Sequence, residues 1–221
     1  MLSGQLSTIK SRSSKYLVKN TLKRFFDIVI SIVFLIPFTF LVLPICAIFI
    51  KLSSPGSVFF VQKRSGMHHK IFHCYKLRTM KLNKQAEYKQ ATKNDKRITK
   101  IGYFLRITHI DELPQLYNVL IGDMSIIGPR PHMLYHTKIY SKHIPYYDLR
   151  LKTKPGLTGL AQIKGYVGEI THETDLKKRV LNDIYYVKKS SLKLNLFILF
   201  MTLKQFFGKL LPFKKRKAIW R

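Results

Sequence analysis

The chain carries one uncharged apolar run of 23 residues, from Ile28 to Ile50, and this run most constrains what it can fold into. Only Ser31, Pro37, Thr39 and Pro44 interrupt the apolar side chains. A single helix of this length would be about 35 Å long, enough to cross the hydrocarbon core of a bilayer. A cleaved signal peptide fits less well, because the stretch is long and no small-residue cleavage site follows it. The run therefore predicts a membrane helix.

Basic residues flank the run on both sides: they are Lys23 and Arg24 before it, and Lys51, Lys63, Arg64 and Lys70 after it. Because positive charge favours the cytoplasmic side, a simple span would have to export one of these flanks. A re-entrant hairpin keeps both flanks on one side, with each half about 17 Å long and reaching roughly one leaflet deep. We therefore predict a re-entrant hairpin, and a kinked span is the alternative.

The predicted break in this membrane helix lies at Pro37, Thr39 and Pro44. A proline removes a backbone donor and clashes with the preceding turn, so two prolines near the middle of the run favour a break there. The carbonyls that this frees must find partners in lipid, and the hydroxyls of Ser31 or Thr39 are suitable.

The charge of the chain is strongly basic. Lys and Arg number 40 against 11 Asp and Glu, which gives a net charge of +29, yet 46% of the residues are hydrophobic. This composition excludes a disordered polycation and implies an anionic partner: nucleic acid, an anionic membrane face or a polyphosphate. No nucleic-acid-binding motif is present and the apolar run does not suit that class, so we expect no nucleic-acid partner.

Cysteine and histidine usage points to no special chemistry. Two cysteines, Cys46 and Cys74, exclude a disulfide-rich scaffold, and both are interpreted as buried small hydrophobic residues. The histidines His68, His69 and His73 have no suitably spaced carboxylate or thiolate, so a solvated loop is favoured over a metal site.

The part after the apolar run alternates strand and helix patterns. Residues 58–62 and 71–75 predict a β-hairpin, and residues 98–107 are apolar at helical spacing. Residues 81–97 are polar and predict an exposed helix or a mobile loop, and residues 161–163 predict a short strand. The fold class is therefore α+β: a small mixed α/β domain attached to the membrane hairpin.

Two adjacent carboxylates, Asp111 and Glu112, stand out in a chain that is poor in acids. They precede a helical stripe of apolar residues: Leu113, Leu116, Val119 and Leu120. Pro114 is tolerated only in the first turn of a helix, so the helix is predicted to begin near Asp111 and to end at Gly122. The helix dipole would stabilise negative charge at this N-terminus. Simple capping by Asp111 is the alternative, but a cap explains one acid and not two in a row.

A second candidate element is the rigid loop Pro129, Arg130 and Pro131, which follows a short apolar segment, residues 125–127, predicted to be a buried strand. The two prolines fix the backbone around Arg130, which suits a guanidinium aimed at a phosphate.

The C-terminal residues 192–211 combine large apolar side chains with Lys193, Lys204 and Lys209, and a polybasic cluster follows. The lysines interrupt the stretch too often for a clean span. The pattern favours an amphipathic helix in the membrane interface, facing anionic lipids, and a core helix is the alternative.

These elements, in this order, resemble the bacterial sugar transferase family of monotopic polyprenyl-phosphate phosphoglycosyl transferases. The matching segments are Lys23–Asp27, Gly56–Phe60 with Gln62, Arg64 and Gly66, Lys76–Met80, Arg106, Asp111–Leu116, Asn118–Leu120, Gly122–Ser125, Gly128–Pro131 and Lys154–Gly159. No single motif is decisive, but their number, order and spacing from about residue 22 to 207 are specific.

The resemblance implies transfer of a sugar-1-phosphate from a UDP-sugar to polyprenyl (undecaprenyl) phosphate, which initiates assembly of a surface glycan such as a capsule, an exopolysaccharide or an O-antigen. It implies a covalent phosphosugar on Asp111, with Glu112 and Asp111 as ligands of Mg²⁺. The residue chemistry agrees, because a carboxylate that attacks a diphosphate needs the phosphate charge neutralised.

The resemblance also assigns the surrounding cations. Arg106 resembles the arginine that binds the acceptor phosphate, and Arg130, within Pro129 to Pro131, the one on the nucleotide side. Lys76 and Arg78 are further candidate phosphate ligands, with a structural role as the alternative for each.

The implied organisation has four parts: a basic segment (1–21), a re-entrant membrane helix (22–52), a catalytic domain (53–191), and an amphipathic interfacial helix with a polybasic tail (192–221). The expected location is the cytoplasmic face of the bacterial inner membrane, with anionic lipids as partners. The sequence leaves open a homodimer and the identity of the sugar.

The chain departs from the family pattern at a few positions. The family's Ser-Pro pair at the membrane break aligns with about Thr39 and Phe40, and a common Trp after the second Pro/Gly loop is replaced by Leu160. An Asn and an Arg that commonly follow are replaced by Lys164 and Tyr166. If that loop holds the donor, an unusual sugar is expected. A membrane-anchored scaffold without catalysis is the alternative function.

Overall fold

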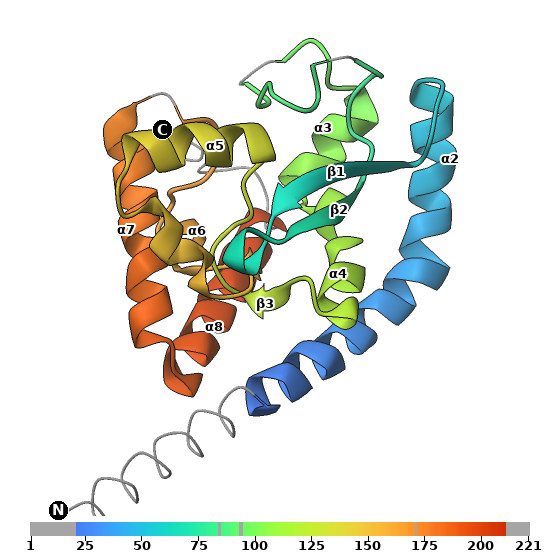
Figure 1. Ribbon diagram of the computed structural model, residues 1–221. Helices are drawn as coiled ribbons and strands as arrows, with labels where there is room; N and C mark the ends of the chain where they lie inside the picture. Colours follow the sequence, from blue (N-terminus) through green and yellow to red (C-terminus); the bar gives the residue numbers. More distant parts are fainter. Residues whose placement is uncertain (1–20, 84, 93–94, 171, 211–221) are drawn as a thin grey trace, which may run out of the picture.

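A computed structural model describes residues 21–83, 85–92, 95–170 and 172–210 (Figure 1). Nearly all of the predicted basic N-terminal segment, and the polybasic tail after residue 210, lie outside these ranges. A helix over residues 21–37 comes first. The helical elements that follow it are η1 (Phe38–Val42), α2 (Leu43–Ser53), η2 (Met67–His69), α3 (Lys100–Ile107), η3 (Ile110–Glu112), α4 (Gln115–Ile121), α5 (Leu134–His143), η4 (Tyr147–Lys152), α6 (Leu160–Ile163), α7 (Glu173–Lys189) and α8 (Leu192–Leu210). The strands are β1 (Phe59–Ser65), β2 (Ile71–Leu77), β3 (Ser125–Ile127) and β4 (Gly156–Thr158).

The apolar run forms a single bent helix. Among the described residues, Thr21–Ser53 is the one helix long and apolar enough to cross a membrane, and only about a tenth of its most apolar window is buried. The chain does not reverse direction within this helix, so the predicted re-entrant membrane hairpin is not confirmed. Instead the helix bends at the π-helical turn η1 and continues as α2 (Figure 1). Pro37 precedes this turn and Pro44 lies in the first turn of α2, so the backbone donors lost to proline fall on both sides of the bend.

The first sheet is the predicted hairpin. Strands β1 and β2 pair antiparallel, from Phe59 opposite Leu77 to Ser65 opposite Ile71. Phe72, Cys74 and Leu77 point into the core, and the free thiol of Cys74 is buried as predicted, as is that of Cys46 in α2. The turn contains His68 and His69 in the left-handed conformation, with His69 3.5 Å from Asp148 at an exposed site.

The second sheet pairs β3 with β4 in parallel. The predicted buried strand over residues 125–127 is confirmed, but the strand predicted at residues 161–163 is wrong: those residues form helix α6, and the strand lies earlier, at Gly156–Thr158. The pairing requires close backbone contact, because a Cβ atom on Gly156 would lie 2.0 Å from the amide nitrogen of Gly128. Helix α6 buries Leu160, Ala161 and Ile163. A short apolar run of this kind occurs both in buried strands and in buried helical turns, so its sequence does not distinguish the two.

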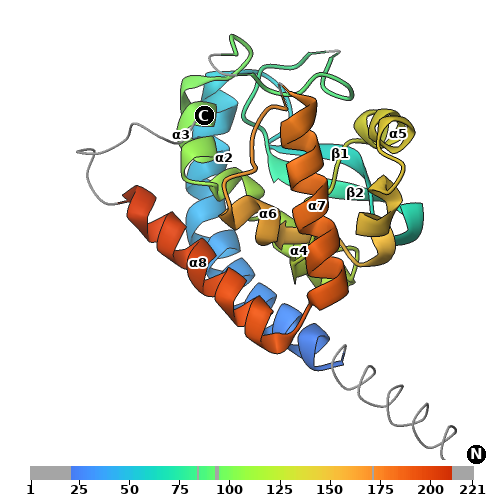
Figure 2. The same ribbon diagram turned by 90° about the vertical axis from the view of Figure 1, so that its left-hand side faces the viewer.

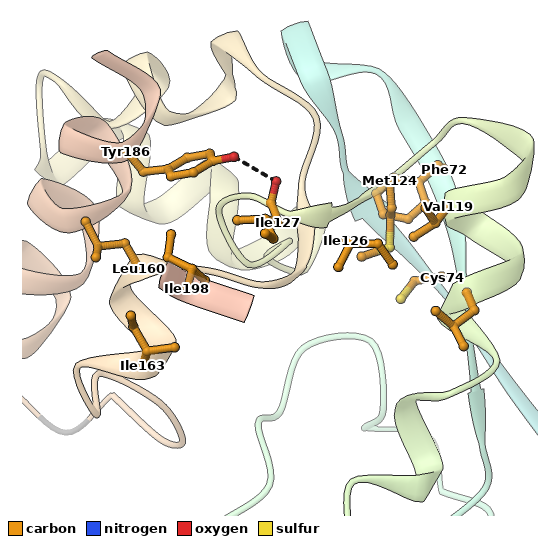
Figure 3. Packing of buried hydrophobic residues seen from close by; sticks show 11 residues of the cluster. Phe72, Cys74, Val119, Met124, Ile126, Ile127, Leu160, Ile163, Tyr186 and Ile198 are labelled. Atoms are coloured by element: carbon orange, nitrogen blue, oxygen red, sulfur yellow. Dashed lines mark hydrogen bonds between the residues drawn. The ribbon is translucent and has the colours of Figure 1, made fainter. Parts of the chain in front are cut away.

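The main core joins the two sheets to the C-terminal helices (Figure 3). Leu116 and Val119 from α4 and Ile126 and Ile127 from β3 pack with side chains of α6, α7 and α8. The hydroxyl of Tyr186 donates a hydrogen bond to the carbonyl of Ile127 at 3.0 Å.

Helix α8 confirms the predicted C-terminal helix and combines two environments. Ile198 is fully buried in the main core, so part of the helix is a core helix. Leu194, Leu199 and Met201 are half-buried against the same core. Six further large apolar side chains of the helix are exposed: Leu192, Leu196, Phe197, Phe200, Leu203 and Phe207. Figure 2 shows α8 running across the lower part of the domain, beside the N-terminal helix. The place of α8 at a membrane interface stays a prediction.

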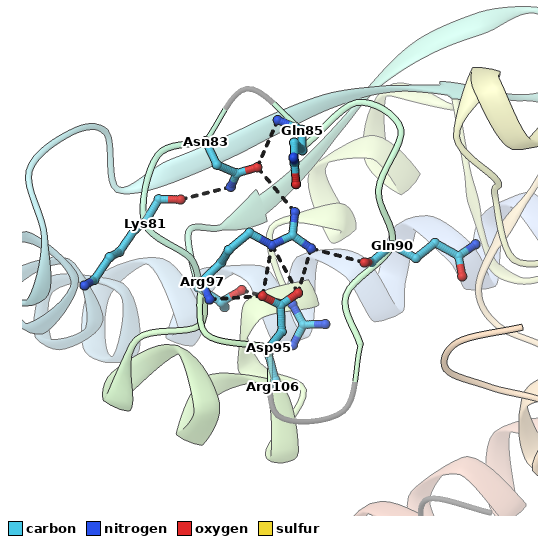
Figure 4. A network of polar contacts seen from close by, with 8 residues as sticks. Lys81, Asn83, Gln85, Gln90, Asp95, Arg97 and Arg106 are labelled. Atoms are coloured by element: carbon cyan, nitrogen blue, oxygen red, sulfur yellow. Dashed lines mark hydrogen bonds and ion pairs between the residues drawn. The ribbon is translucent and has the colours of Figure 1, made fainter. Parts of the chain in front are cut away.

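The described part of residues 81–97 forms a loop without a helix, held together by one arginine (Figure 4). Arg97 donates to the carboxylate of Asp95 at 2.6 to 3.1 Å and to the carbonyl of Gln90 at 3.1 Å. The hydrogen bonds from Arg97 hold the pKa of Asp95 well below its usual range. These contacts order the loop from within.

Candidate active site

The two adjacent carboxylates lie in a short turn of their own. Asp111 and Glu112 belong to the 3₁₀ turn η3, which follows His109 in the left-handed conformation at φ 57°. The helix was predicted to begin near Asp111, but α4 begins at Gln115, after Pro114, and the turn η3 precedes it. Gly122 ends the helix as predicted, with a φ of 92°. Asp111 makes no capping hydrogen bond, which removes the capping alternative.

Glu112 is held by two cations. Its carboxylate accepts a hydrogen bond from Lys76 Nζ at 2.7 Å and two from the guanidinium of Arg130, at 2.5 and 3.1 Å. Burial alone would raise the pKa of Glu112, but the charges of Arg130 and Lys76 outweigh it and hold the pKa well below the usual value. Glu112 is therefore a fixed, ionised anchor for both cations.

Asp111 is buried beside this group without a hydrogen bond of its own. The side chain is 6% exposed, and within the described part of the chain no donor reaches its carboxylate. Burial and, second, the charge of Glu112 raise the pKa of Asp111 to about 6, against the opposing effect of Lys76, Arg106 and Arg130. A desolvated carboxylate without a hydrogen bond keeps its lone pairs available, which is what a nucleophile requires.

Arg106 comes to this site on α3. Thr99 caps the helix by accepting a hydrogen bond from the amide of Gly102, and a Cβ atom on Gly102 would meet the carbonyl of Thr79 at 2.0 Å. The helix therefore packs directly on the end of the β-hairpin. There Arg106 donates to the hydroxyl of Thr79 at 3.3 Å, and its charge acts on Asp111 as predicted for a cation of the site.

Arg78 does not join these residues. Its guanidinium donates to the carbonyl of Pro55, to that of Ser54 at 2.7 Å and to that of Ile50 at 3.4 Å. Those are carbonyls at and just after the C-terminal end of α2, which an isolated helix leaves unpartnered. The structure thus favours the structural alternative for Arg78 and places it away from the phosphate site predicted for it.

The loop Pro129–Pro131 is fixed through its carbonyls, which explains how Arg130 is aimed. Each of the three accepts one hydrogen bond: that of Pro129 from the amide of Gly156 at 2.9 Å, that of Arg130 from Arg150 at 2.6 Å, and that of Pro131 from Arg64 at 3.1 Å. Arg150 is itself held by Asp183, at 2.7 and 2.9 Å, in a fully buried ion pair. Sequence reasoning missed Arg150 and Asp183, because no local pattern marks an arginine whose partner lies 33 residues away.

The N-terminal end of the membrane helix is tied to the same domain. Arg24 donates to the carbonyls of Val119 and Leu120 at 2.5 and 2.6 Å, at the end of α4. Asp27 accepts from the hydroxyl of Ser125 and from the amide of Ile126 at 3.1 and 3.0 Å. These residues belong to the segment Lys23–Asp27, which carried the family resemblance without an assigned role.

The carboxylates at this site can hold a metal ion only together with other ligands. No group of three or more His, Cys, Asp or Glu suited to a metal occurs among the described residues. Magnesium commonly takes one or two carboxylates and completes its shell with water and substrate phosphate. Asp111 has free oxygens for this, whereas both oxygens of Glu112 accept hydrogen bonds from Lys76 or Arg130.

Comparison with known proteins identifies the family that this chain resembles. The family model described as bacterial sugar transferase matches residues 18–209. The chain is 45% identical over 189 residues to the UDP-glucose:undecaprenyl-phosphate glucose-1-phosphate transferase of Escherichia coli, covering 84% of this chain and 40% of that protein. It is 42% identical over 189 residues to the exopolysaccharide production protein PSS of Rhizobium leguminosarum, covering 82% and 92% respectively.

A further relative carries a different sugar in its name. The undecaprenyl-phosphate galactose phosphotransferase of Salmonella typhimurium is 38% identical over 215 residues, covering 90% of this chain and 42% of that protein. The chain thus spans about two fifths of the length of the Escherichia coli and Salmonella relatives, and most of the Rhizobium one.

Proposed function

This chain belongs to the bacterial sugar transferase family, and we propose that it transfers a sugar-1-phosphate from a UDP-sugar to undecaprenyl phosphate. The observation that carries the proposal is the pair of carboxylates: Asp111 buried without a hydrogen bond, next to Glu112, which is clamped by Lys76 and Arg130. The names of the relatives support the substrates, and they differ in the sugar.

In the first step a carboxylate oxygen of Asp111 attacks the phosphorus that carries the sugar. An oxygen–phosphorus bond forms, the bond from that phosphorus to the bridging oxygen breaks, and UMP leaves with the electron pair. Arg130 and Lys76 lie where the developing charge on phosphate oxygens needs compensation, and Glu112 holds them there before substrate binds.

In the second step the phosphate oxygen of the lipid attacks the same phosphorus. The bond to Asp111 breaks, the carboxylate is restored, and the lipid carries a diphosphate-linked sugar. Arg106 acts on Asp111 and makes no hydrogen bond to Glu112 among the contacts of the described residues, so it is the group we assign to the acceptor phosphate. Splitting the transfer in two means that the soluble donor and the lipid acceptor need not be bound together.

Magnesium is part of the proposal. A bound Mg²⁺ would act as a Lewis acid on the donor diphosphate. The free oxygens of Asp111 support it as the first protein ligand, and the engaged oxygens of Glu112 make that residue the weaker candidate.

The bent helix supports a re-entrant placement with the catalytic domain on the cytoplasmic face. Its N-terminal end is bound to α4 and β3 through Arg24 and Asp27, and its C-terminal end is bound to Arg78. Both ends therefore contact one folded domain, whereas a straight span would carry one end to the other side. Between the ends, apolar side chains such as Phe40 and Leu41 are 74% and 67% exposed, as expected for contact with lipid.

The function is tested with solubilised protein, Mg²⁺, undecaprenyl phosphate and a panel of UDP-sugars, beginning with UDP-glucose, by following UMP release. Without acceptor, a donor labelled in the phosphate next to the sugar should leave label on the protein. Asp111→Asn should abolish both signals, and Asp148→Asn, an exposed acid, should change neither. Wild-type protein that releases no UMP with any donor, or full activity in Asp111→Asn, would refute the proposal and favour a non-catalytic scaffold.

The membrane placement has a separate test. Single cysteines placed at Lys51 and in the N-terminal segment are probed with an impermeant thiol reagent in sealed inverted vesicles, in a background with Cys46 and Cys74 replaced by serine. A re-entrant helix makes both positions reactive from the same side. Reaction from opposite sides would establish a span instead.

A further inference from the structure

Arg179 on α7 is buried without an acidic partner. Arg179 is 7% exposed, and its guanidinium donates one hydrogen bond, to the carbonyl of Gly168 at 3.1 Å. Its Nε atom has no partner, and none of the described carboxylates forms an ion pair with it. Burying a guanidinium without compensating charge is costly, so such a group calls for an anion.

The nearby Arg150 shows what a paired arginine looks like in the same protein. Arg150 is also buried, but both of its bonds to Asp183 compensate its charge. Asp183 is thereby engaged and acts on Arg179 only as a more distant charge. Burial, followed by the charge of Arg130, lowers the pKa of Arg179 to about 10, which shows that the distant Asp183 does not compensate the buried guanidinium.

A second buried side chain with an unpartnered nitrogen, His132, lies within the electrostatic reach of Arg179. His132 is 6% exposed, its Nε2 atom has no partner, and its pKa is lowered well below the usual value by burial and by Arg150 and Arg179. Its Nδ1 atom lies 2.6 Å from the hydroxyl of Tyr147, which also accepts a hydrogen bond from Arg150. In the tautomer in which that hydroxyl donates to Nδ1, the neutral ring carries its proton on Nε2 and can donate it to a ligand.

We propose that Arg179 and His132 bind the phosphate of the donor that leaves with the nucleoside. The inference rests on the proposed function and adds a subsite to it. Arg130 connects the two places: its guanidinium is bonded to Glu112, its charge acts on Arg179, and 34% of its side chain is exposed to an incoming ligand. The phosphorus under attack lies at Asp111, and the adjoining phosphate lies beyond Arg130.

The position of this subsite favours the soluble donor over the lipid as the source of the phosphate. Figure 1 shows α7 on the opposite side of the domain from α2, the C-terminal part of the long apolar helix. The acceptor phosphate approaches from the membrane, where Arg106 on α3 packs against the end of the hairpin next to α2.

The test measures binding of UMP, and of UDP-glucose, to the full-length detergent-solubilised protein by equilibrium dialysis, together with donor and acceptor KM. Arg179→Met removes the charge at similar length, Arg179→Lys keeps the charge but not the planar fork, and Lys178→Met removes an exposed charge from the same helix. We expect Arg179→Met to raise the Kd of UMP and the donor KM about 10- to 100-fold, as for loss of a charged hydrogen bond. Arg179→Lys should fall between, and the acceptor KM and Lys178→Met should not change.

Thermal unfolding without ligand separates this role from a structural one. A buried arginine without a bound anion destabilises the ligand-free protein, so Arg179→Met should keep or raise the Tm. The variant should also lose the increase in Tm that UMP produces in the wild type. Transfer activity with unchanged UMP binding in Arg179→Met and Arg179→Lys would overturn this inference alone. A wild-type protein that neither transfers nor binds nucleotide would overturn the proposed function and this subsite together.

Discussion

Two buried ionic clusters lie on either side of the Pro129–Pro131 loop. On one side, Arg150 and Asp183 form a pair that is 1% and 2% exposed, in which two hydrogen bonds join one guanidinium to one carboxylate. On the other side, Glu112 binds both Lys76 and Arg130, and its neighbour Asp111 accepts no hydrogen bond from any described residue. The first arrangement satisfies every charge and positions a loop. The second leaves one carboxylate desolvated, which costs stability and retains reactivity.

The sharpest way to break this comparison is to neutralise the unsatisfied carboxylate. Asp111→Asn should lower the transfer rate by about 1,000-fold or more, because the amide cannot form the proposed covalent intermediate. It should not lower the Tm, since the amide removes a buried charge that no donor stabilises. The transfer rate and the Tm are measured on one preparation, so that both expectations are tested together. A large drop in Tm would assign Asp111 a structural role.

Neutralising the carboxylate of the Arg150–Asp183 pair should instead lower the stability of the protein. Asp183→Asn leaves Arg150 as an uncompensated buried charge, which is expected to destabilise the protein by about 3 to 5 kcal/mol. Asp175→Asn, on the same helix and outside any ion pair, is the matched control. Thermal unfolding in detergent measures the difference, and equal Tm values for the two variants would contradict the comparison.

Arg130→Lys probes the fork that binds Glu112. Lysine keeps the charge but loses the two parallel hydrogen bonds, so we expect a loss of about 10- to 100-fold in kcat/KM for the donor. Stability should change little, because Lys76 still neutralises Glu112. Lys152→Ala, an exposed cation nearby, is the control, and donor kinetics with unchanged acceptor KM are the expected signature.

The last prediction concerns the pH dependence of stability. In the unfolded chain Asp111 titrates near its ordinary pKa of 3.8, and in the folded protein near 6. Between these values the folded state holds the extra proton, so rising pH destabilises the wild type relative to Asp111→Asn, by about 3 kcal/mol in full once the pH is well above 6. Unfolding of both proteins in EDTA from pH 4 to pH 7.5 tests this, and parallel curves would show that the carboxylate is not desolvated.

Local patterns predicted much of the fold. The hairpin, the helix before Ile107, the strand at Ser125–Ile127 and the end of α4 at Gly122 follow from side-chain period and turn residues, which act over a few positions. The prolines located the bend of the membrane helix, but they did not reveal that a π-helical turn carries the chain through it without reversal.

The sequence predicted the acidic residues of the candidate site better than its basic residues. Asp111 and Glu112 stand out because acids are rare in this chain. Lys76 and Arg78 are equivalent by sequence, yet one binds Glu112 and the other the carbonyls that end α2, since only the tertiary fold decides what lies opposite each. Arg150 gave no local signal, and its role appears only with Asp183 in place.

The segment from Lys76 to Thr79 touches three different structures within four residues. Lys76 contacts Glu112, Arg78 holds the end of the membrane helix, and Thr79 receives Arg106. If the helix lies in one leaflet as proposed, this segment sets the height of the reacting groups above the lipid plane. The proposed active site would then lie at one fixed distance from the lipid headgroups, and the proposed lipid acceptor would reach it by lateral diffusion without leaving the bilayer.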